Sequence, residues 1–236
     1  MSIKKYNLIE FIQFQFLSLF ALKLKIMNSI DKLKWRYATK KFDTSKRLSE
    51  SQIDILKNTF NLTATSYGLQ PLKLIVLKNQ EIKNSLQEHS FNQSQVTECS
   101  HLLIICIKTN IDENYIDEKF DLEKKERGTP ETVIKDFRAF LKETISTKST
   151  EETEKSSINQ AYISLGKLMT VCAFEEIDSC PMEGFNSIKY DEILNLKAIH
   201  LKSVLLLPVG FRAEDDMMSS LKKVRIPIEE SVITID

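Results

Sequence analysis

The chain has 236 residues, 42% of them apolar, which is enough to bury a full hydrophobic core in one domain of ordinary size. Its 33 basic and 33 acidic residues cancel, so no overall field favours nucleic acid or an anionic membrane as a partner. Four scattered cysteines without a CxxC pair and three dispersed histidines predict reduced thiols in the cytoplasm and no metal site.

Residues 1–26 form an extension whose status the sequence leaves open. The segment Asn7 to Leu22 is apolar and follows two lysines, but Glu10 interrupts it and no small-residue cleavage site follows. It is also too short and too polar for a membrane span. A true start at Met27, an additional helix and a targeting segment are the three interpretations, and the folded domain is expected over residues 27–236.

The domain is predicted to begin with two helices. A short helix is expected over Met27–Trp35, where apolar residues recur ahead of a basic segment. Ser49 with Gln52 three residues later forms a capping box, which predicts a second helix from about Glu50 to Leu62.

The next segments predict two strands that enclose a helix. Residues 63–71 have the composition of a loop and are rich in hydroxyl groups. The apolar runs at residues 72–78 and 101–108 predict strands, the second of them fully buried, and residues 81–89 predict a helix between them.

The second half of the chain is mainly helical in pattern. Residues 112–148 are highly charged and predict two helices, with Thr129 as N-cap and Pro130 in the first turn of the second. Residues 149–177 predict a longer helix that packs on more than one side. Residues 203–211 predict a third buried strand, and a charged tail closes the chain. Three apolar strands among many helices predict an α+β fold.

Four short motifs are candidates for chemistry, although each is weak alone. They are WRYATKKFD from Trp35, the hydroxyl loop TATSYGLQP from Thr63, CPMEGF from Cys180, and KKVR before Pro227. The third motif places one of only five glycines, Gly184, directly after a glutamate. A glycine there indicates either a left-handed helix end or a backbone that a ligand must approach closely.

In this order and spacing, the motifs resemble those of the FMN-dependent nitroreductase family, which includes oxygen-insensitive NAD(P)H nitroreductases and dihydropteridine reductase-like members. The resemblance runs from about Met27 to the C-terminus. It implies a nitroreductase-like fold, with a central, mostly antiparallel β-sheet flanked by helices, in an intertwined homodimer. It also implies a reductase of nitroaromatics, quinones or pterins that works by ping-pong hydride transfer. A flavin-binding or degenerate member without that activity is the alternative.

The resemblance assigns most of the matching residues to cofactor binding. Arg36, Lys223 and Arg225 would clamp the flavin phosphate, for which arginine offers paired donors. NADH or NADPH would be the hydride donor, and a small molecule the electron acceptor. The further expected FMN contacts are Tyr37, Ala38, Thr65, Ser66, Gly68, Asn92, Gln95, Pro181 and Met182.

The resemblance also implies which residues act at the flavin ring. Lys40 would lie beside the N1 and C2 carbonyl edge, where a positive charge stabilises the reduced anion. Beside Glu183, the amide of Gly184 would approach N5, where a side chain would block cofactor and hydride donor. Gln95 stands where many members carry a second lysine, so a less positive reduction potential is expected.

Several residues carry a structural interpretation beside a functional one. Phe137 and Phe140 fall in the region that forms the active-site lid in relatives, and a core role is equally open for both. His101, His200 and Cys180 are expected to be structural, because no partner is placed to activate the thiol. Hydride transfer between nicotinamide and flavin needs stacking rather than a general base.

Overall fold

The computed structural model describes residues 29–235, and the chain divides into two units, Met1–Arg36 and Tyr37–Asp236. The expectations for residues 1–26 lie outside the described residues. In the first unit the described part is helix α2 (Ser29–Trp35), followed by Arg36, whose amide donates to the Lys32 carbonyl at 3.2 Å. The expected short helix is confirmed over these residues.

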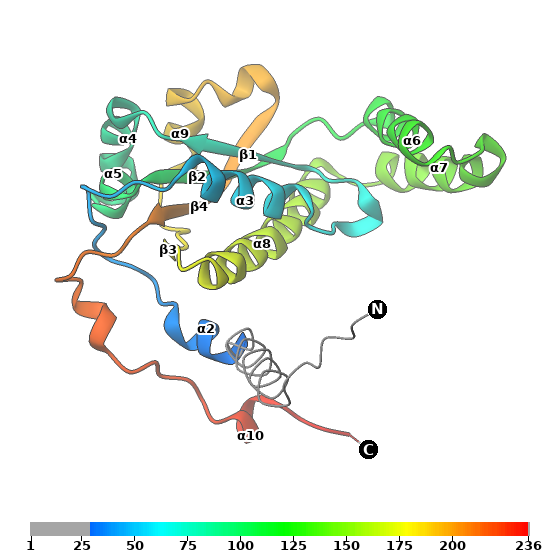
Figure 1. Ribbon diagram of the computed structural model, residues 1–236. Helices are drawn as coiled ribbons and strands as arrows, with labels where there is room; N and C mark the ends of the chain where they lie inside the picture. Colours follow the sequence, from blue (N-terminus) through cyan, green and yellow to red (C-terminus); the bar gives the residue numbers. More distant parts are fainter. Residues whose placement is uncertain (1–28, 236) are drawn as a thin grey trace, which may run out of the picture. The chain divides into compact units, whose positions relative to one another are not determined.

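The second unit is built on a four-stranded sheet in the order β1-β2-β4-β3, and all strand pairs are antiparallel (Figure 1). The strands are β1 (Leu72–Leu77), β2 (His101–Lys108), β3 (Asp178–Ser179) and β4 (Leu201–Gly210). The sheet confirms the α+β fold and the three predicted strands. The short strand β3 was not predicted, because its two polar residues carry no apolar pattern.

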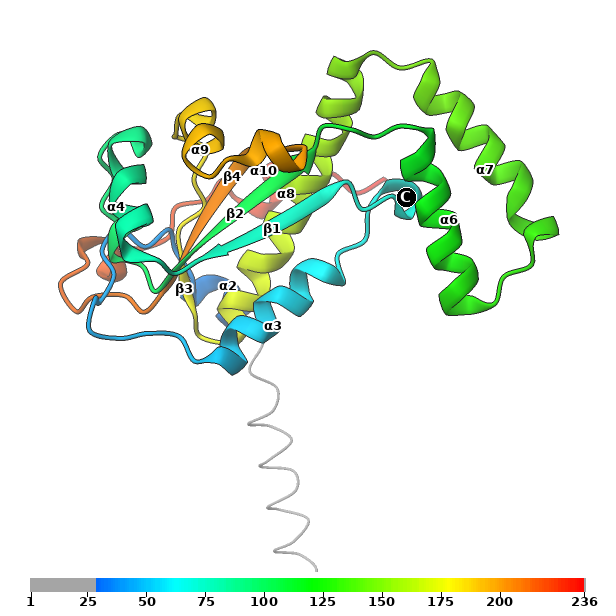
Figure 2. The same cartoon turned by 90° about the horizontal axis from the view of Figure 1, so that it is seen from above.

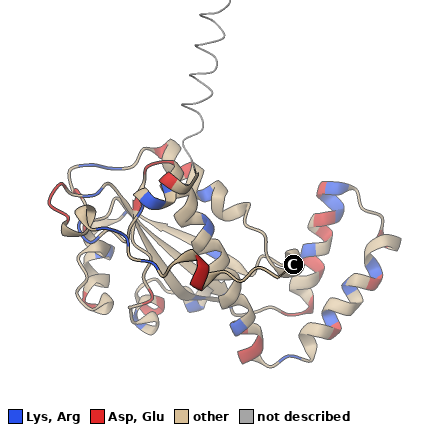
Figure 3. Ribbon diagram, turned by 90° about the horizontal axis from the view of Figure 1, so that it is seen from below, with Lys and Arg blue, Asp and Glu red and all other residues tan. Residues whose placement is uncertain are grey.

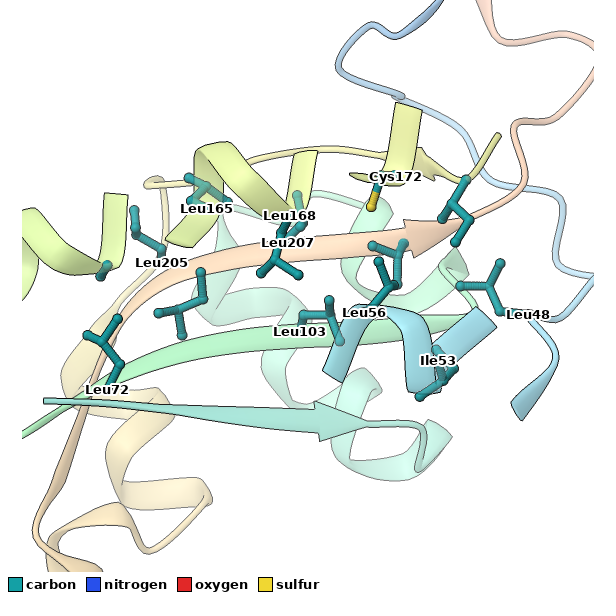
Figure 4. Close-up of a cluster of buried hydrophobic side chains, with 14 of the residues drawn as sticks. Leu48, Ile53, Leu56, Leu72, Leu103, Leu165, Leu168, Cys172, Leu205 and Leu207 are labelled. Carbon is teal, nitrogen blue, oxygen red and sulfur yellow. The ribbon is translucent and has the colours of Figure 1, made fainter. Parts of the chain in front are cut away.

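Alternate residues of β2 enter two different cores, as expected of a strand buried on both faces. Leu103 and Ile105 pack in one cluster with α3 (Glu50–Asn61) and α8 (Thr150–Phe174). Figure 4 shows the side chains of this cluster between the two helices and the strands. The capping boxes that start α3 and α8 are both present, so these two helices begin where the sequence predicts.

The other face of β2 carries Leu102, Ile104 and Cys106, which pack in the second cluster. Three helices cover this face, and Figure 2 shows α4 and α9 on it. They are α4 (Gln80–Gln87), α5 (Gln95–Glu98) and α9 (Ser187–Ile193). The sequence predicted only α4, since α5 and α9 are too short for a helical period.

Helices α6 (Glu113–Arg127) and α7 (Glu131–Ser146) pack against each other around a small core of their own. Lysines and acids alternate along both helices in Figure 3, and Arg138 and Lys142 of α7 pair with Asp117 of α6. The predicted N-cap is wrong: Pro130 itself occupies that position, because the chain is still extended there, and Thr129 lies before it.

Short helical turns complete the described chain: η1 (Ser66–Gly68), η2 (Glu88–Ser90), η3 (Leu196–Ile199), η4 (Met217–Ser220) and α10 (Ile228–Ser231). Among residues 29–235, no helix has the length and apolar character that a membrane crossing requires. The same residues contain no cluster of three side chains suited to a metal ion.

Candidate active site

Strand β3 brings the first sequence motif to the CPMEGF turn. Ala38 forms a parallel bridge with Ser179, and the Thr39 amide donates to the Ser179 carbonyl at 3.3 Å. The Lys40 ammonium donates to the Cys180 sulfur across 3.9 Å, although the two residues are 140 positions apart. Two motifs that were weak alone therefore meet in one place.

Asp216 fixes the backbone of the first motif. Its carboxylate is only 2% exposed and accepts hydrogen bonds from the amides of Lys40 at 2.9 Å and Lys41 at 3.3 Å. It also accepts from the Tyr37 hydroxyl and the Met218 amide, both at 3.0 Å. Burial alone would raise the pKa of Asp216, but the hydrogen bonds outweigh it and hold the pKa below its ordinary value. The carboxylate is thus charged in the folded protein at neutral pH.

The side chain of Tyr37 is already engaged within the chain. Its ring lies 4.5 Å from the guanidinium carbon of Arg212, which pairs with the buried Asp178 carboxylate at 2.6 Å. Burial, above all, and the nearby Asp216 carboxylate raise the pKa of Tyr37, while Arg212 opposes them. The predicted FMN contact at Tyr37 stays a prediction.

The CPMEGF turn is held by both the sheet and α8. Met182 pairs with Leu206 of β4 through two backbone hydrogen bonds of 2.9 and 3.0 Å. The Glu183 carboxylate lies near the hydroxyl of Tyr162 on α8 and raises the pKa of that hydroxyl. The turn is anchored on each side of its exposed tip.

Gly184 lies outside any helix and has no left-handed φ angle, so the helix-end interpretation of this glycine is wrong. A Cβ at this position would lie 3.5 Å from the Phe91 ring and from the Gln93 amide nitrogen, which is ordinary contact. Gln93 also donates to the Gly184 carbonyl at 3.1 Å. The described packing therefore does not require glycine here, and the approach of a ligand to this backbone stays a prediction.

The residues facing Gly184 have an uncommon backbone. Phe91 and Asn92 have consecutive left-handed φ angles of 54° and 55°, and Phe91 is 73% exposed. A bulky aromatic residue in this region is strained, and such strain gathers at binding sites. The exposed Phe91 ring beside Gly184 was not predicted from the sequence.

The hydroxyl loop uses its polar groups to fix its own shape. The Thr65 hydroxyl accepts from the Gln70 amide at 2.9 Å, and the Ser66 amide donates to the Gln160 side chain of α8 at 2.8 Å. Gly68 has a left-handed φ of 66°, with nothing within 4 Å of an added Cβ. The predicted FMN contacts in this loop stay predictions.

An aromatic cluster joins this loop to α7. The rings of Phe137 and Phe140 stack at 6.2 Å, and Tyr67 meets them edge-on at 6.1 and 6.5 Å. Phe137 and Phe140 are 43% and 49% exposed, so the core role considered for them is excluded. Tyr67 and Phe137 line an open cavity of about 680 Å³ together with Phe120 and Leu141. The lid role of the two phenylalanines stays a prediction.

The predicted phosphate clamp stays a prediction. Lys223 and Arg225 lie in an exposed tail after η4, where the Arg225 guanidinium donates to the Val224 carbonyl at 2.6 Å. Arg36 closes the other unit. Gln95 is only 6% exposed at the start of α5, and its predicted place beside the ring stays a prediction.

Comparison with known proteins gives the family. The sequence matches the nitroreductase family over residues 33–211. A Staphylococcus haemolyticus protein, named as a candidate NAD(P)H nitroreductase, is 31% identical over 211 residues, which cover 86% of this chain and 95% of that protein. The oxygen-insensitive NAD(P)H nitroreductase of Salmonella typhimurium is 27% identical over 209 residues, covering 85% and 96%.

The fold comparison agrees. A candidate nitroreductase from Exiguobacterium sibiricum, solved in complex with FMN, matches with a TM-score of 0.74 over 89% of this chain and 98% of its own, at 20% identity. The family resemblance inferred from the motifs is confirmed: this chain belongs to the nitroreductase family.

Proposed function

We propose that this protein is an NAD(P)H-dependent FMN oxidoreductase that reduces nitroaromatics, quinones or pterins. The relatives named as NAD(P)H nitroreductases and the FMN complex of a protein with the same fold support this assignment. The observation that carries it is the meeting of the Lys40 ammonium with the Cys180–Gly184 turn. Family membership alone would also suit a degenerate member.

The residues at this meeting point suit an anionic ring edge. Lys40 is exposed, and its ammonium has no carboxylate partner within residues 29–235. Gly184, on the adjoining turn, is a glycine that its own packing does not require. A positive charge without an acid, next to a backbone open to close approach, fits a bound flavin that becomes negative on reduction.

When bound, FMN supplies a ring that accepts a hydride from reduced nicotinamide and gives it to the second substrate. In this proposal Lys40 stabilises the arriving negative charge, and the anchored turn keeps the Gly184 backbone in place. Arg36, Lys223 and Arg225 hold the phosphate. Because both substrates use one site in turn, the kinetics should be ping-pong, with parallel double-reciprocal lines.

A homodimer is part of the same proposal. The tail presents apolar side chains to solvent, with Val224 84%, Ile226 66% and Ile228 74% exposed. Tyr162 and Ile163 of α8 are also 44% and 52% exposed. A second copy of the chain would cover these side chains, because apolar patches on a surface mark interfaces where they are contiguous. Sedimentation at low micromolar concentration should give twice the chain mass, and a monomer that retains its flavin would contradict the dimer.

The cytoplasm is the proposed location. All four cysteines are buried and none forms a disulfide, which suits a reducing compartment. Fractionation of cells that express the full chain should recover the protein with cytoplasmic markers.

The cofactor and the role of Lys40 can be tested together. The purified protein should be yellow, and heat should release FMN rather than FAD. Lys40→Met should slow flavin reduction by NADH or NADPH at least about 10-fold, equivalent to about 1.4 kcal/mol, while FMN stays bound. Arg225→Ala should chiefly lose FMN.

Lys41→Met is the matched control, because the Lys41 ammonium pairs with Asp215 at the surface. This variant should keep the parental rate. A Lys40 variant reduced as fast as the parent would refute the assigned role. A yellow protein that neither nucleotide reduces would favour the degenerate alternative.

A further inference from the structure

A second pocket opens where β1 ends and β2 begins, with a volume of about 480 Å³. The antiparallel register pairs Leu77 with Leu102, so Lys78, the next residue after β1, comes opposite His101 at the start of β2. Arg47, ahead of α3, lines the same pocket. The volume falls in the range of small-molecule sites. Neither the family motifs nor the proposed flavin site uses these residues.

The pocket is surrounded by more positive than negative charge. Burial, above all, lowers the pKa of His101, and the charges of Lys83, Lys78 and Arg47 lower it further, while Glu50 opposes them. His101 is only 7% exposed. Three cations and one carboxylate thus act on this imidazole, and of these Arg47, Lys78 and the Glu50 carboxylate line the pocket, in a chain whose net charge is zero. The excess is local and favours an anion.

Two of the cations are held by backbone carbonyls. The fully buried Lys83 ammonium donates to the carbonyls of Cys99 at 2.6 Å and Thr97 at 3.1 Å, and burial lowers its pKa. The Arg47 guanidinium donates to the same Cys99 carbonyl at 3.0 Å, and Lys78 is exposed. Within residues 29–235, neither Arg47 nor Lys78 forms an ion pair, so the charges of these two lining residues are available to a ligand.

Ser100 holds the imidazole of His101 in place. The Ser100 oxygen accepts from the Leu48 amide at 2.8 Å and lies 2.9 Å from His101 Nδ1. Because the serine oxygen has two lone pairs and one hydrogen, it can donate to Nδ1 or accept from it. When the serine donates, the proton of a neutral imidazole resides on Nε2, where it can serve as a donor to a phosphate.

We propose that this pocket binds a small phosphorylated molecule, with the phosphate held by Arg47, Lys78 and His101. Guanidinium and ammonium groups are the usual donors to phosphate, and the neutral imidazole adds a third. The pocket is larger than a bare phosphate ion needs, which leaves room for an organic body. The site is independent of the proposed reductase function.

The chain contains only three histidines, so NMR of the imidazole signals reports the site directly. The full-length protein with its native cofactor content is titrated with inorganic phosphate or glycerol 3-phosphate at constant ionic strength. Binding should raise the pKa of His101 by about 1, because a nearby anion favours the imidazolium. The signals of His89 and His200 should not move when phosphate is added. Glycerol 3-phosphate should bind at least as tightly as phosphate.

Lys78→Gln should weaken phosphate binding about 10-fold. Lys73→Gln, at the other end of β1, removes the same charge away from the pocket and should bind phosphate as the parent does. Both variants should retain the parental flavin content. An equal effect of chloride, unchanged binding by the Lys78 variant, or weaker binding of glycerol 3-phosphate than of phosphate would overturn the proposal.

Discussion

Asp216 should be a stability determinant of the candidate site although the proposed chemistry does not use it. Replacing it by alanine removes an acceptor from four donors: the amides of Lys40, Lys41 and Met218 and the Tyr37 hydroxyl. All four hydrogen bonds are partly buried, although the side chains of Lys40 and Lys41 are exposed. A net contribution of about 0.5 to 1 kcal/mol from each bond predicts a loss of about 3 kcal/mol in the free energy of unfolding.

Urea denaturation at pH 7 and one protein concentration measures this loss. Asp215→Ala is the matched control, because the neighbouring Asp215 is 68% exposed and pairs with Lys41 at the surface. That variant should unfold at nearly the parental urea concentration. An Asp216→Ala protein as stable as the parent would show that the four hydrogen bonds contribute nothing net, and the anchoring role would be wrong.

The pH dependence has a defined sign. The pKa of Asp216 is lower in the folded protein than its ordinary value of 3.8. Its contribution is therefore complete above the unfolded pKa and is lost as the pH falls through the folded pKa. Asp216→Asn removes this titration while keeping an oxygen acceptor. Its deficit in unfolding free energy should be constant near neutral pH and should shrink below about pH 4; a deficit that grows in acid would contradict the assignment.

Two further substitutions test the role of Gly184 in FMN binding and the contribution of the Tyr190 hydroxyl to stability. Gly184→Ala should change the unfolding free energy of the flavin-stripped protein by less than about 0.5 kcal/mol, because the added methyl meets ordinary contacts, yet it should weaken FMN binding and reduction. Parental activity would end the N5 interpretation. Tyr190→Phe should cost about 1.5 kcal/mol in urea denaturation, since it breaks the buried 2.6 Å hydrogen bond to the Ser90 hydroxyl; a loss below about 0.5 kcal/mol would refute this value.

The elements that the sequence predicts well are those specified by neighbouring residues. The continuous apolar run of β2 reflects burial on both faces, and the serine caps of α3 and α8 act within three residues. For the candidate site, the prediction relied on family motifs, because motifs far apart in the sequence can be assigned to one site without any local pattern that connects them. Lys40 and Cys180 are such a pair.

The parts that were missed depend on contacts between distant segments. Strand β3 forms because Asp178 and Ser179 pair with the end of β4. The residues of β3 alone do not predict a strand. Asp216 is the third of three consecutive acids, and nothing in the sequence distinguishes it from Asp215. Its role depends on a hydrogen bond from the Lys40 amide, which lies 176 positions away in the sequence. The residues that support the candidate site therefore depend on long-range contacts that the sequence alone does not predict.

The sequence also did not predict left-handed backbone conformations at residues other than glycine. The steric cost of one of them can be tested at the end of α8. Glu176 has a φ of 56°, and the next amide, of Ile177, bonds back to the Cys172 carbonyl at 2.8 Å. Helix α6 ends at Gly128 with a φ of 68°, where glycine avoids the steric cost. Tertiary packing of Ile177, which is 1% exposed, imposes the same conformation on a glutamate.

Glu176→Gly should therefore raise the free energy of unfolding by about 0.5 to 1 kcal/mol, the cost of the left-handed conformation less the greater freedom of glycine in the unfolded chain. Glu175→Gly is the control, because Glu175 has an ordinary φ of −86° and glycine there adds only unfolded-state freedom. Urea denaturation of both variants should move their midpoints in opposite directions. Equal destabilisation would mean that the geometry at Glu176 carries no steric cost.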